Sequence, residues 1–415
     1  MKKSFTLSMI TLVLFGCNSS GGNSDNNSSP EPITNNNGVT ISKPGSRSIT
    51  KITDISRFGY KDQSYDPSNL SALPIPAYPG EDKQWVKDSD LSDDFEYTFS
   101  ATSNRSNFGG DKNNKWYNFY HQEWDGPGAT YWQEDHVAVQ NGNLEISVSR
   151  NSRTDKQNKP GVTAGCISSH QQVQYPVFVE ASVSLADISL ASAVWLLSPD
   201  DTQEIDILEA YAGADNGNDY FSKMIHLSHH SFIREPFQDY QPRDENSWWK
   251  SDISGFNSWG EYGWNGGNRQ YIQIGVNWVN PYHFEYYING ELVRVVYNNA
   301  FATKQYGEWV YSYPKVDSDN NLVIEGYQNV DIYAKSTNDF DFNTLKAASE
   351  QSPASVIDPL NYQNGKGFYK PADIIINMEL QSWWTNDPTD SDLADTSGKN
   401  KTLVDWVRVF KPIEK

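Results

Sequence analysis

Three acidic residues, Glu204, Asp206 and Glu209, stand within the six-residue stretch 204–209, EIDILE. The apolar residues between them predict an extended strand, in which Glu204 and Asp206 share one face. Glu209 comes three residues after Asp206, so a regular strand would point its side chain to the opposite face. A β-bulge, in which the two residues before Glu209 together oppose one partner residue, would absorb the extra residue. We therefore predict a bulge that returns Glu209 to the face of the other two acids.

A row of three carboxyl groups on one face can carry out nucleophilic and acid–base chemistry. Two carboxyls about 5–5.5 Å apart, one the nucleophile and the other the acid/base, are the arrangement of a retaining glycosidase. Asp206 between the two Glu residues would add negative charge, which keeps one neighbour protonated and orients the nucleophile by a hydrogen bond. A surface strand with outward charges, or a calcium site, is the alternative interpretation of the same residues.

The elements that must position these acids are strands. Two Asn-Gly turns, at 141–142 and 289–290, each separate apolar runs and predict hairpins. Alternating apolar residues predict further strands at 177–185, 272–278 and 403–410. Helical periodicity is nearly absent, apart from a turn or two near 345–349. The pattern predicts an all-β sandwich of antiparallel sheets.

The N-terminus has the features of a targeting segment. Lys2 and Lys3, a short apolar run over 5–16 and then Cys17 resemble a bacterial lipoprotein signal, residues 1–17, that ends at a lipidated Cys17. Such a protein is exported and anchored by lipid at the cell surface or outer membrane, with no membrane span in the mature chain. Phe15 is bulkier than the residue usual before the cysteine, so ordinary secretion is the alternative.

The rest of the chain divides into a tether and a large domain. Residues 18–73 begin with a stretch rich in Asn, Ser, Gly and Pro that buries too little to order itself, and they predict a flexible low-complexity tether. Residues 74–415 are the expected catalytic β-sandwich domain. Within it, 299–370 breaks the strand rhythm as a loop insertion or a small subdomain, and we expect it to wall the binding cleft.

Composition limits the partners. The formal net charge of −20 disfavours nucleic acid and anionic polymers and suits a neutral or cationic substrate. The chain has 14 Trp, 24 Tyr and 18 Phe, which fit either a strand-rich core or stacking platforms for sugars. With Cys17 lipidated, Cys166 has no partner, so we expect no disulfide and a buried structural thiol.

With its surroundings, the acidic stretch resembles the bulged form of the glycoside hydrolase family 16 signature, and the surroundings resemble those of the β-agarases. The resembling segments lie at 124–128, 194–203, 226–234, 236–242, 373–377 and 404–409. The likeness covers roughly residues 74–298 and 366–412. It implies a β-jelly-roll sandwich of two antiparallel sheets with a concave substrate cleft, an enzyme that cleaves with retention, and a monomer.

The resemblance implies Glu204 as nucleophile, Glu209 as acid/base and Asp206 as the assisting acid. It also implies that Trp195 stacks on a galactose unit and that Arg234 and Glu379 hydrogen-bond the sugar chain. A core aromatic residue, a surface Arg and an outward-facing strand Glu are the respective alternatives for these three. Further candidates for substrate binding are His226, Trp124 and Trp132, and packing within the fold is the alternative for the two tryptophans.

Metal ions are expected to play no part in catalysis, and no cofactor is required. The spacing H-x-x-H-H at 226–230 lacks the helical arrangement of a zinc protease, so a zinc site is disfavoured. Family members often hold one calcium ion away from the cleft, and Asp405 with the backbone of Gly142 matches that place. Such an ion would be structural.

The leading hypothesis is an endo-acting β-agarase that cleaves β-1,4-galactosidic bonds in agarose to neoagaro-oligosaccharides. Neutral agarose suits the acidic chain better than sulfated porphyran, so a porphyranase is the nearest alternative. A non-catalytic galactan-binding jelly-roll module, or an adhesin whose acids bind calcium, is the alternative from another class. The 299–370 segment leaves product length and the preferred galactan open.

Overall fold

The computed structural model describes residues 75–100, 104–110, 114–251 and 255–415, which belong to one compact unit. The predicted signal segment with Cys17 and the predicted tether lie outside the described residues. Among the residues described, no helix is both long and apolar enough to cross a membrane.

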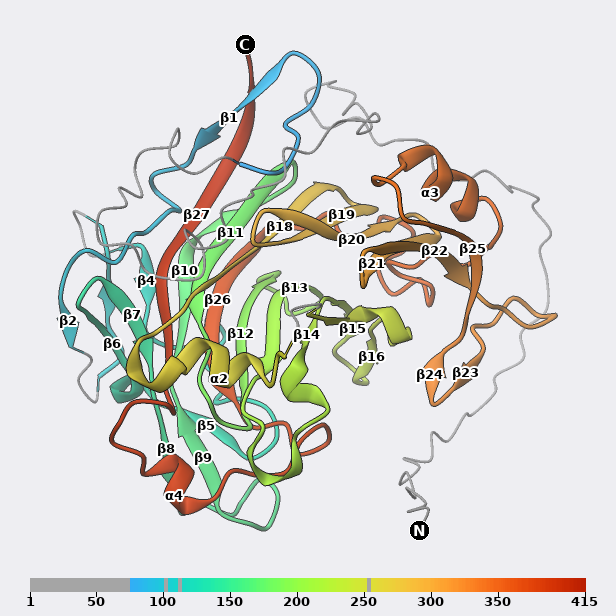
Figure 1. The fold of residues 1–415 in the computed structure, drawn as a ribbon. Helices are drawn as coiled ribbons and strands as arrows, with labels where there is room; N and C mark the ends of the chain where they lie inside the picture. Colours follow the sequence, from blue (N-terminus) through green and yellow to red (C-terminus); the bar gives the residue numbers. More distant parts are fainter. Residues whose placement is uncertain (1–74, 101–103, 111–113, 252–254) are drawn as a thin grey trace, which may run out of the picture. The chain divides into compact units, whose positions relative to one another are not determined.

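The smaller of two large sheets carries the acid-rich stretch, and all its strand pairs are antiparallel (Figure 1). Its strands in spatial order are β16 (Gln238–Tyr240), β15 (His229–Ile233), β13 (Gln203–Tyr211), β12 (Ala191–Leu197), β26 (Ala372–Glu379), β10 (Cys166–Val173), β4 (Trp116–Tyr117) and β3 (Asn107–Phe108). Two short strands join at one side: β14 (Met224–His226) pairs with β13, and β17 (Trp248–Lys250) pairs with β14.

The larger, twelve-stranded sheet holds both predicted hairpins and the three further predicted strands. Its strands in spatial order are β2 (Phe99–Ser100), β6 (Val137–Gln140), β7 (Asn143–Ile146), β27 (Thr402–Glu414), β11 (Val177–Ser184), β18 (Ile272–Asn280), β19 (His283–Ile288), β20 (Glu291–Tyr297), β21 (Ala300–Gln305), β22 (Glu308–Pro314) and β25 (Val330–Ser336), with β1 (Lys83–Lys87) paired to β27.

The remaining elements are short. Small sheets are formed by β5 (Thr130–Trp132), β9 (Gly161–Ala164) and β8 (Val148–Asn151), and by β23 (Ile324–Glu325) and β24 (Tyr327–Gln328). The helices are α2 (Trp259–Trp264), α3 (Phe342–Ser349) and α4 (Asp390–Leu393), with 3-10 turns η1 (Glu134–His136), η2 (Asp215–Gly217), η3 (Phe221–Lys223), η4 (Glu245–Ser247) and η5 (Asn265–Gly267). The helical turn predicted near 345–349 is α3, which begins where the Asp341 side chain accepts the N–H groups of Asn343 and Thr344.

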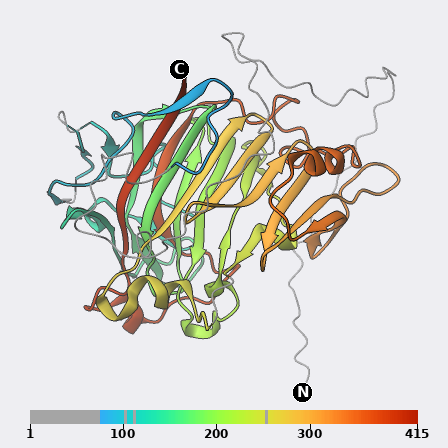
Figure 2. The same cartoon turned by 45° about the horizontal axis from the view of Figure 1, so that its top comes forward.

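The core lies between the two large sheets, so the predicted sandwich is confirmed (Figures 1 and 2). One apolar cluster joins Ile205 and Ile207 of the smaller sheet with residues of the larger sheet such as Ile274. A hydrogen bond also crosses between the layers, because the hydroxyl of Tyr286 on β19 donates to the Ser228 carbonyl at 2.7 Å. Alternation on β13 therefore buries the isoleucines inward and leaves the acids on the opposite side of the smaller sheet.

The 299–370 segment is an ordered part of the fold. Strands β21, β22 and β25 continue the larger sheet, and α3 packs with them around a second apolar cluster that includes Trp309 and Leu345. The following stretch supports β15, because Asp358 Oδ1 accepts a hydrogen bond from Ser231 at 2.9 Å and Gln363 Nε2 donates to Ser231 Oγ at 3.0 Å. This segment thus buttresses the strand next to β13.

Candidate active site

The predicted bulge in β13 is present. Leu208 lies opposite Val194 and Asp206 lies opposite Trp195, so Ile207 has no partner of its own on β12. Both residues of the bulge, Ile207 and Leu208, are completely buried in the core. Two successive residues therefore face inward, and Glu209 returns to the face of the other acids.

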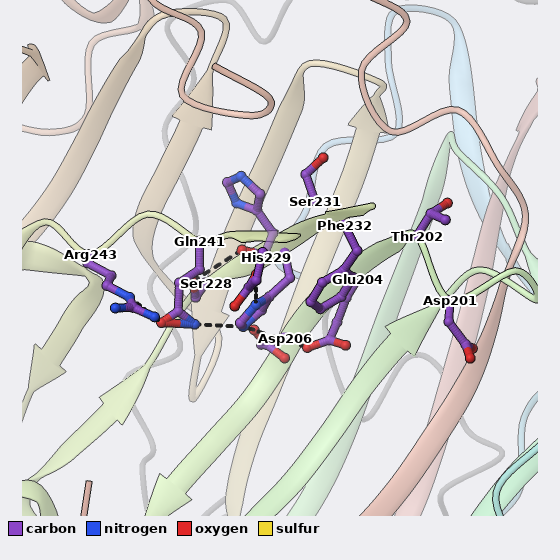
Figure 3. Close-up of polar contacts among 12 residues, drawn as sticks. Asp201, Thr202, Glu204, Asp206, Ser228, His229, Ser231, Phe232, Gln241 and Arg243 are labelled. Carbon is purple, nitrogen blue, oxygen red and sulfur yellow. Dashed lines mark hydrogen bonds and ion pairs between the residues drawn. The ribbon is translucent and has the colours of Figure 1, made fainter. Parts of the chain in front are cut away.

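Two histidines stand across from the acids on the neighbouring chain segment. Glu209 pairs with His226 on β14, and Glu204 pairs with His230 on β15. The N–H of Asp206 between them donates to the Ser228 carbonyl at 3.0 Å. Figure 3 shows Glu204 and Asp206 side by side on this face. Each acid is thus held against a defined point of the 226–230 segment.

His230 lies among carboxylates. Its Nε2 is 3.7 Å from Glu204 Oε1 and 3.7 Å from Asp206 Oδ2, and its Nδ1 is 2.8 Å from Asp239 Oδ1. Burial lowers the pKa of His230, but the three carboxylates outweigh burial and raise that pKa to about 10. We therefore take His230 to be a cation at neutral pH, positioned to neutralise charge on the acids beside it.

Gln241 bears on the protonation of that ring. Its Oε1 accepts from Arg243 Nε at 2.9 Å, which turns its Nε2 toward His230 Nε2 at 2.7 Å (Figure 3). This orientation suits the neutral ring, because an amide N–H needs a lone pair as acceptor. A cationic His230 therefore requires the Gln241 amide to turn, so that its oxygen faces the ring. The three carboxylates favour the charged ring more strongly than the contact with Gln241 favours the neutral ring.

The acids differ in their surroundings. Burial raises the pKa of Glu204 well above its usual value, opposed by His230. Burial likewise raises the pKa of Asp206, to about 6. Burial acts in the same direction on Glu209, but hydrogen bonds from His226 and Tyr211 prevail and lower the pKa of Glu209. The ligand-free site thus favours an ionised Glu209 and a protonated Glu204.

Glu209 has two hydrogen-bond partners. His226 Nδ1 lies 2.6 Å from Glu209 Oε2, and the hydroxyl of Tyr211 lies 2.6 Å from Glu209 Oε1. The His226 ring stacks on Trp248 with ring centroids 4.2 Å apart, and its Nε2 is buried without a hydrogen-bond partner. His226, predicted to bind substrate, therefore contacts the acid/base candidate directly.

Trp195 and Glu379 lie on the strands beyond β13. Trp195 is 7% exposed, and its Nε1 donates to Asn377 Oδ1 at 2.6 Å. Both carboxylate oxygens of Glu379 are engaged, by Asn377 Nδ2 at 2.9 Å and by Gln381 Nε2. The two residues predicted to bind sugar are thus linked to each other through Asn377.

An aromatic group lies next to this face. The ring of Tyr120 stacks with Trp132 and with Trp195, at centroid distances of 5.4 Å and 6.3 Å. Trp124 contacts both Tyr120 and Trp132 edge-on, and it is 47% exposed. Trp132 is completely buried and its indole donates to the Met378 carbonyl, so in this structure it has no free face for a sugar.

Asp201, in the β12–β13 turn, lies beside this group and accepts a hydrogen bond from the Tyr120 hydroxyl at 3.0 Å. His121 lies between Asp201, at 2.9 Å, and Asp373, at 2.5 Å. Burial lowers the pKa of His121, but these two partners raise it to about 9. Arg234 donates from Nε to the Asp201 carbonyl and lies over the Phe232 ring at 4.4 Å. The predicted sugar-binding Arg is thus positioned at the same turn.

Strand pairing brings together the two residues named for calcium. Val404 lies opposite Leu144, so Asp405 stands beside the 141–142 turn that contains Gly142. A carboxylate and backbone carbonyl oxygens are the ligands that Ca²⁺ takes, and these residues fit such an ion in kind. A separate group, Glu204, Asp206 and His230, brings its polar atoms within 4.8 Å of one another; we interpret it as a charge cluster.

Sequence reasoning missed several residues of the site. Tyr211, Asn377 and Gln381 join the acids to Glu379, and His121 fastens the aromatic group. The sequence indicates His230 only as part of the disfavoured zinc pattern at 226–230. The alternation of His226, Ser228 and His230 on one extended segment could have placed both histidines on one face; the pairing of that segment with β13 had no signal in the sequence.

A β-sandwich with two Glu residues on one face of a bulged strand fits a glycoside hydrolase, and the comparisons with known proteins agree. Residues 85–338 match the family described as Beta-porphyranase A-D, GH16 domain. The chain therefore belongs to glycoside hydrolase family 16 and is an agarase-like glycosidase.

Individual relatives are agarases by name. Beta-agarase D of Zobellia galactanivorans is 44% identical over 84% of this chain and 75% of its own length. The crystal structure of its catalytic domain matches 83% of this chain and 99% of that domain, with a TM-score of 0.73. A Beta-agarase of Phocaeicola plebeius is 37% identical over 81% of this chain and 88% of its own. An inactivated beta-agarase B in complex with agaro-octaose is 34% identical, covers 84% of this chain and 100% of that chain, and has a TM-score of 0.59.

Changing the length of the bulge tests whether Glu209 must share a face with Glu204 and Asp206. Replacing Leu208 by two residues should turn Glu209 away from the other acids and abolish turnover, because strand side chains alternate faces. Deleting Leu208 gives a plain alternation that keeps all three acids on one face, so some activity should survive if the fold does. Hydrolysis rates and circular dichroism of both variants check this. Full activity after the insertion would show that the phase argument is wrong.

Proposed function

We propose that this glycosidase is a retaining endo-β-agarase that cleaves β-1,4-galactosidic bonds in agarose to neoagaro-oligosaccharides. The observation that carries the proposal is the bulged face of β13, which sets Glu204, Asp206 and Glu209 in one row. The likeness to proteins named agarases, including one in complex with agaro-octaose, supports agarose as substrate.

In the proposed reaction, Glu209 protonates the glycosidic oxygen while Glu204 attacks the anomeric carbon. The C–O bond to the leaving chain breaks and a bond from Glu204 to the sugar forms. Glu209, now ionised, then takes a proton from water, and the resulting hydroxide displaces Glu204 and restores both residues. Asp206 shares a proton with Glu204 and donates a hydrogen bond to it when Glu204 is ionised.

The protonation of the ligand-free site runs opposite to these roles, since it favours an ionised Glu209 and a protonated Glu204. His230 opposes this at Glu204, because a cation 3.7 Å from both Glu204 and Asp206 favours one negative charge on that pair. The proton of the pair then has to lie on Asp206 during attack. Glu209 needs a proton from another group.

The sugar-binding side of the proposal rests on the residues around the row. Trp124 offers an exposed indole next to Tyr120, and such faces stack on the apolar faces of sugar rings. Arg234 offers guanidinium donors at the β12–β13 turn.

We further propose that the protein is exported, that it is anchored by a lipid at Cys17, and that it acts as a monomer.

A porphyranase is the second candidate, because the matching family description names porphyranases. A sulfate would need a local cation, and the basic groups around the row include Arg234, Arg243 and His230. The net charge of −20 favours the neutral polymer. A non-catalytic module is disfavoured, since binding alone does not require Glu204 and Glu209 on one face.

The substrate is tested by supplying agarose, porphyran and carrageenan side by side. We expect reducing ends and a series of neoagaro-oligosaccharides from agarose, with little release from the two sulfated polymers. Chromatography of the products against time distinguishes endo from exo action. Release from porphyran without release from agarose would overturn the agarase proposal in favour of the porphyranase.

The two Glu roles are tested by truncation and rescue. Glu204→Ala and Glu209→Ala should each lower kcat by at least about 10³-fold, because each removes one half of the double displacement. With azide and an aryl glycoside, Glu204→Ala should give the α-glycosyl azide and Glu209→Ala the β-glycosyl azide, read by NMR. The reverse pattern would exchange the roles and agree with the protonation of the ligand-free site.

Calcium is proposed at Asp405 and Gly142 as a structural ion. Removing it with a chelator should lower Tm by several degrees and leave kcat at lower temperature nearly unchanged, because the ion would stabilise the fold without contacting the sugar. Asp405→Asn should remove the response of Tm to added Ca²⁺, measured calorimetrically. Loss of kcat on chelation without loss of Tm would contradict a structural role.

A further inference from the structure

A chain of side chains leads from Glu209 across the sheet to Glu379. The hydroxyl of Tyr211 bonds both Glu209 Oε1, at 2.6 Å, and Gln381 Oε1. The amide of Gln381 in turn bonds Glu379 Oε1. The carboxyl groups at both ends are nearly buried, with 8% exposure each. Solvent therefore has little access to the chain.

The sequence of β12 makes this crossing geometrically simple. Ala193 lies between Glu209 and Asn377, and Ala191 lies between Tyr211 and Glu379. Residues directly opposite one another share a face of the sheet, so these two methyl groups lie beneath the chain. Small side chains there leave room for Tyr211 to reach Gln381 above the intervening strand.

The orientation of the far end is fixed by Trp195. Its indole can only donate, so the Asn377 atom that it contacts at 2.6 Å must be the oxygen. Asn377 therefore presents its NH₂ to Glu379 Oε2 at 2.9 Å. Glu379 Oε2 must accept, and a proton on Glu379 has to lie on Oε1, the oxygen that faces Gln381.

The number of hydrogens in the chain requires one carboxyl proton. The chain has three contacts in sequence: Glu209 to Tyr211, Tyr211 to Gln381, and Gln381 to Glu379. The Tyr211 hydroxyl supplies one hydrogen, and the Gln381 amide supplies one, because its other end is an oxygen. The third contact is satisfied only if Glu209 or Glu379 is protonated.

Each location of the proton corresponds to one orientation of Gln381. With the proton on Glu209, Tyr211 accepts from Glu209 and donates to Gln381, whose NH₂ faces Glu379. With the proton on Glu379, Gln381 is turned, its NH₂ faces Tyr211, and Tyr211 donates to an ionised Glu209. The two orientations of a side-chain amide have nearly the same shape, so both fit the site.

We propose that Glu379 is a positioning residue that shares a single proton with the acid/base Glu209 through Tyr211 and Gln381. The inference rests on the role proposed for Glu209. Glu379 can hold the proton that Glu209 requires as general acid, and the orientation of the Gln381 amide corresponds to the end that carries it. The structure has the orientation of a protonated Glu209, with the Gln381 oxygen at Tyr211 and its NH₂ at Glu379.

The electrostatics of the two ends agree with this. Burial raises the pKa of Glu379 to about 7; the hydrogen bonds from Gln381 and Asn377 oppose this rise, and the charges of Glu209 and Asp206 add to it. The pKa of Glu209 is lowered by its bonds to His226 and Tyr211. The titratable groups that face the two ends are Glu204, Asp206, His226, His230, Tyr211 and Cys166. The pKa directions of the two carboxyls therefore favour Glu379 as the end that holds the proton while the site is empty, and that state requires Gln381 to turn its NH₂ from Glu379 to Tyr211.

The decisive variant is Glu379→Gln, which cannot ionise. Its amide oxygen must face the NH₂ of Asn377, so its own NH₂ faces Gln381 and holds Gln381 in the turned orientation. Tyr211 then donates permanently to Glu209 and favours the ionised form. We expect the alkaline limb of the pH profile of kcat/KM to move to lower pH by about one unit. The reason is that protonated Glu209 loses the stabilisation of one hydrogen bond.

Two controls separate this effect from a general one. Glu180 is also buried, with its pKa raised to about 8 by burial, but it lies on β11 of the other sheet; Glu180→Gln should leave the limb in place. In a Tyr211→Phe background the connection is cut, so adding Glu379→Gln should no longer move the limb. Tm and circular dichroism establish that each variant folds.

An NMR titration of the Glu209 carboxyl does not depend on enzymatic activity, so it tests the shared proton separately from the agarase proposal. With ¹³C-labelled Glu carboxyls, the resonance absent from Glu209→Gln identifies Glu209, and its midpoint should fall by a similar amount in Glu379→Gln. If Glu379→Gln leaves the Glu209 midpoint and the alkaline limb of kcat/KM unchanged and only raises KM, the shared-proton proposal is overturned. Glu379 would then be a sugar-binding residue. Failure of the wild-type enzyme to cleave agarose, with the midpoint shifted, would instead overturn the substrate alone.

Discussion

The crowding of carboxyl groups on one face of the smaller sheet is the constraint on which the rest of the site depends. Glu204, Asp206 and Glu209 come from one strand, and Glu379 lies two strands away on the same face. Buried carboxylates repel one another and lose hydration, so they are stable only with cations, donors or shared protons. Each acid here has such a partner: His230 beside Glu204 and Asp206, His226 and Tyr211 on Glu209, and the two amides on Glu379.

The surrounding fold provides these partners from elements far apart in the chain. The 226–230 segment supplies both histidines, and its position is fixed from behind by Tyr286 of the larger sheet and by residues 358–363. The aromatic group is fastened by His121 to the β12–β13 turn and to β26. The 299–370 segment therefore acts on the site through the strand that it supports.

The proton requirement of the proposed reaction and the hydrogen-bond pattern of the site lead to the same residues. A retaining glycosidase needs one protonated and one ionised carboxyl, and a row of buried acids tends to share protons between its members. In this protein His230 provides a positive charge near the nucleophile candidate. The Tyr211–Gln381–Glu379 chain provides a place to hold the proton of the acid. Ala191 and Ala193 matter because their small side chains leave room for that chain.

The sequence by itself determined the strand class, the two Asn-Gly hairpins and the bulge, because alternation and turn chemistry are local properties of the chain. It also pointed to Glu204, Asp206 and Glu209, whose spacing has a chemical meaning. Only the tertiary structure decided what those acids contact. That Glu379 reaches Glu209 depends on pairing between β26, β12 and β13, in which Ala191 lies opposite Glu379, 379 − 191 = 188 positions later. That Trp132 is buried while Trp124 is exposed likewise depends on a distant residue, since the Trp132 indole donates to the Met378 carbonyl. Such pairing is set by packing of the whole core, which no short stretch of sequence encodes.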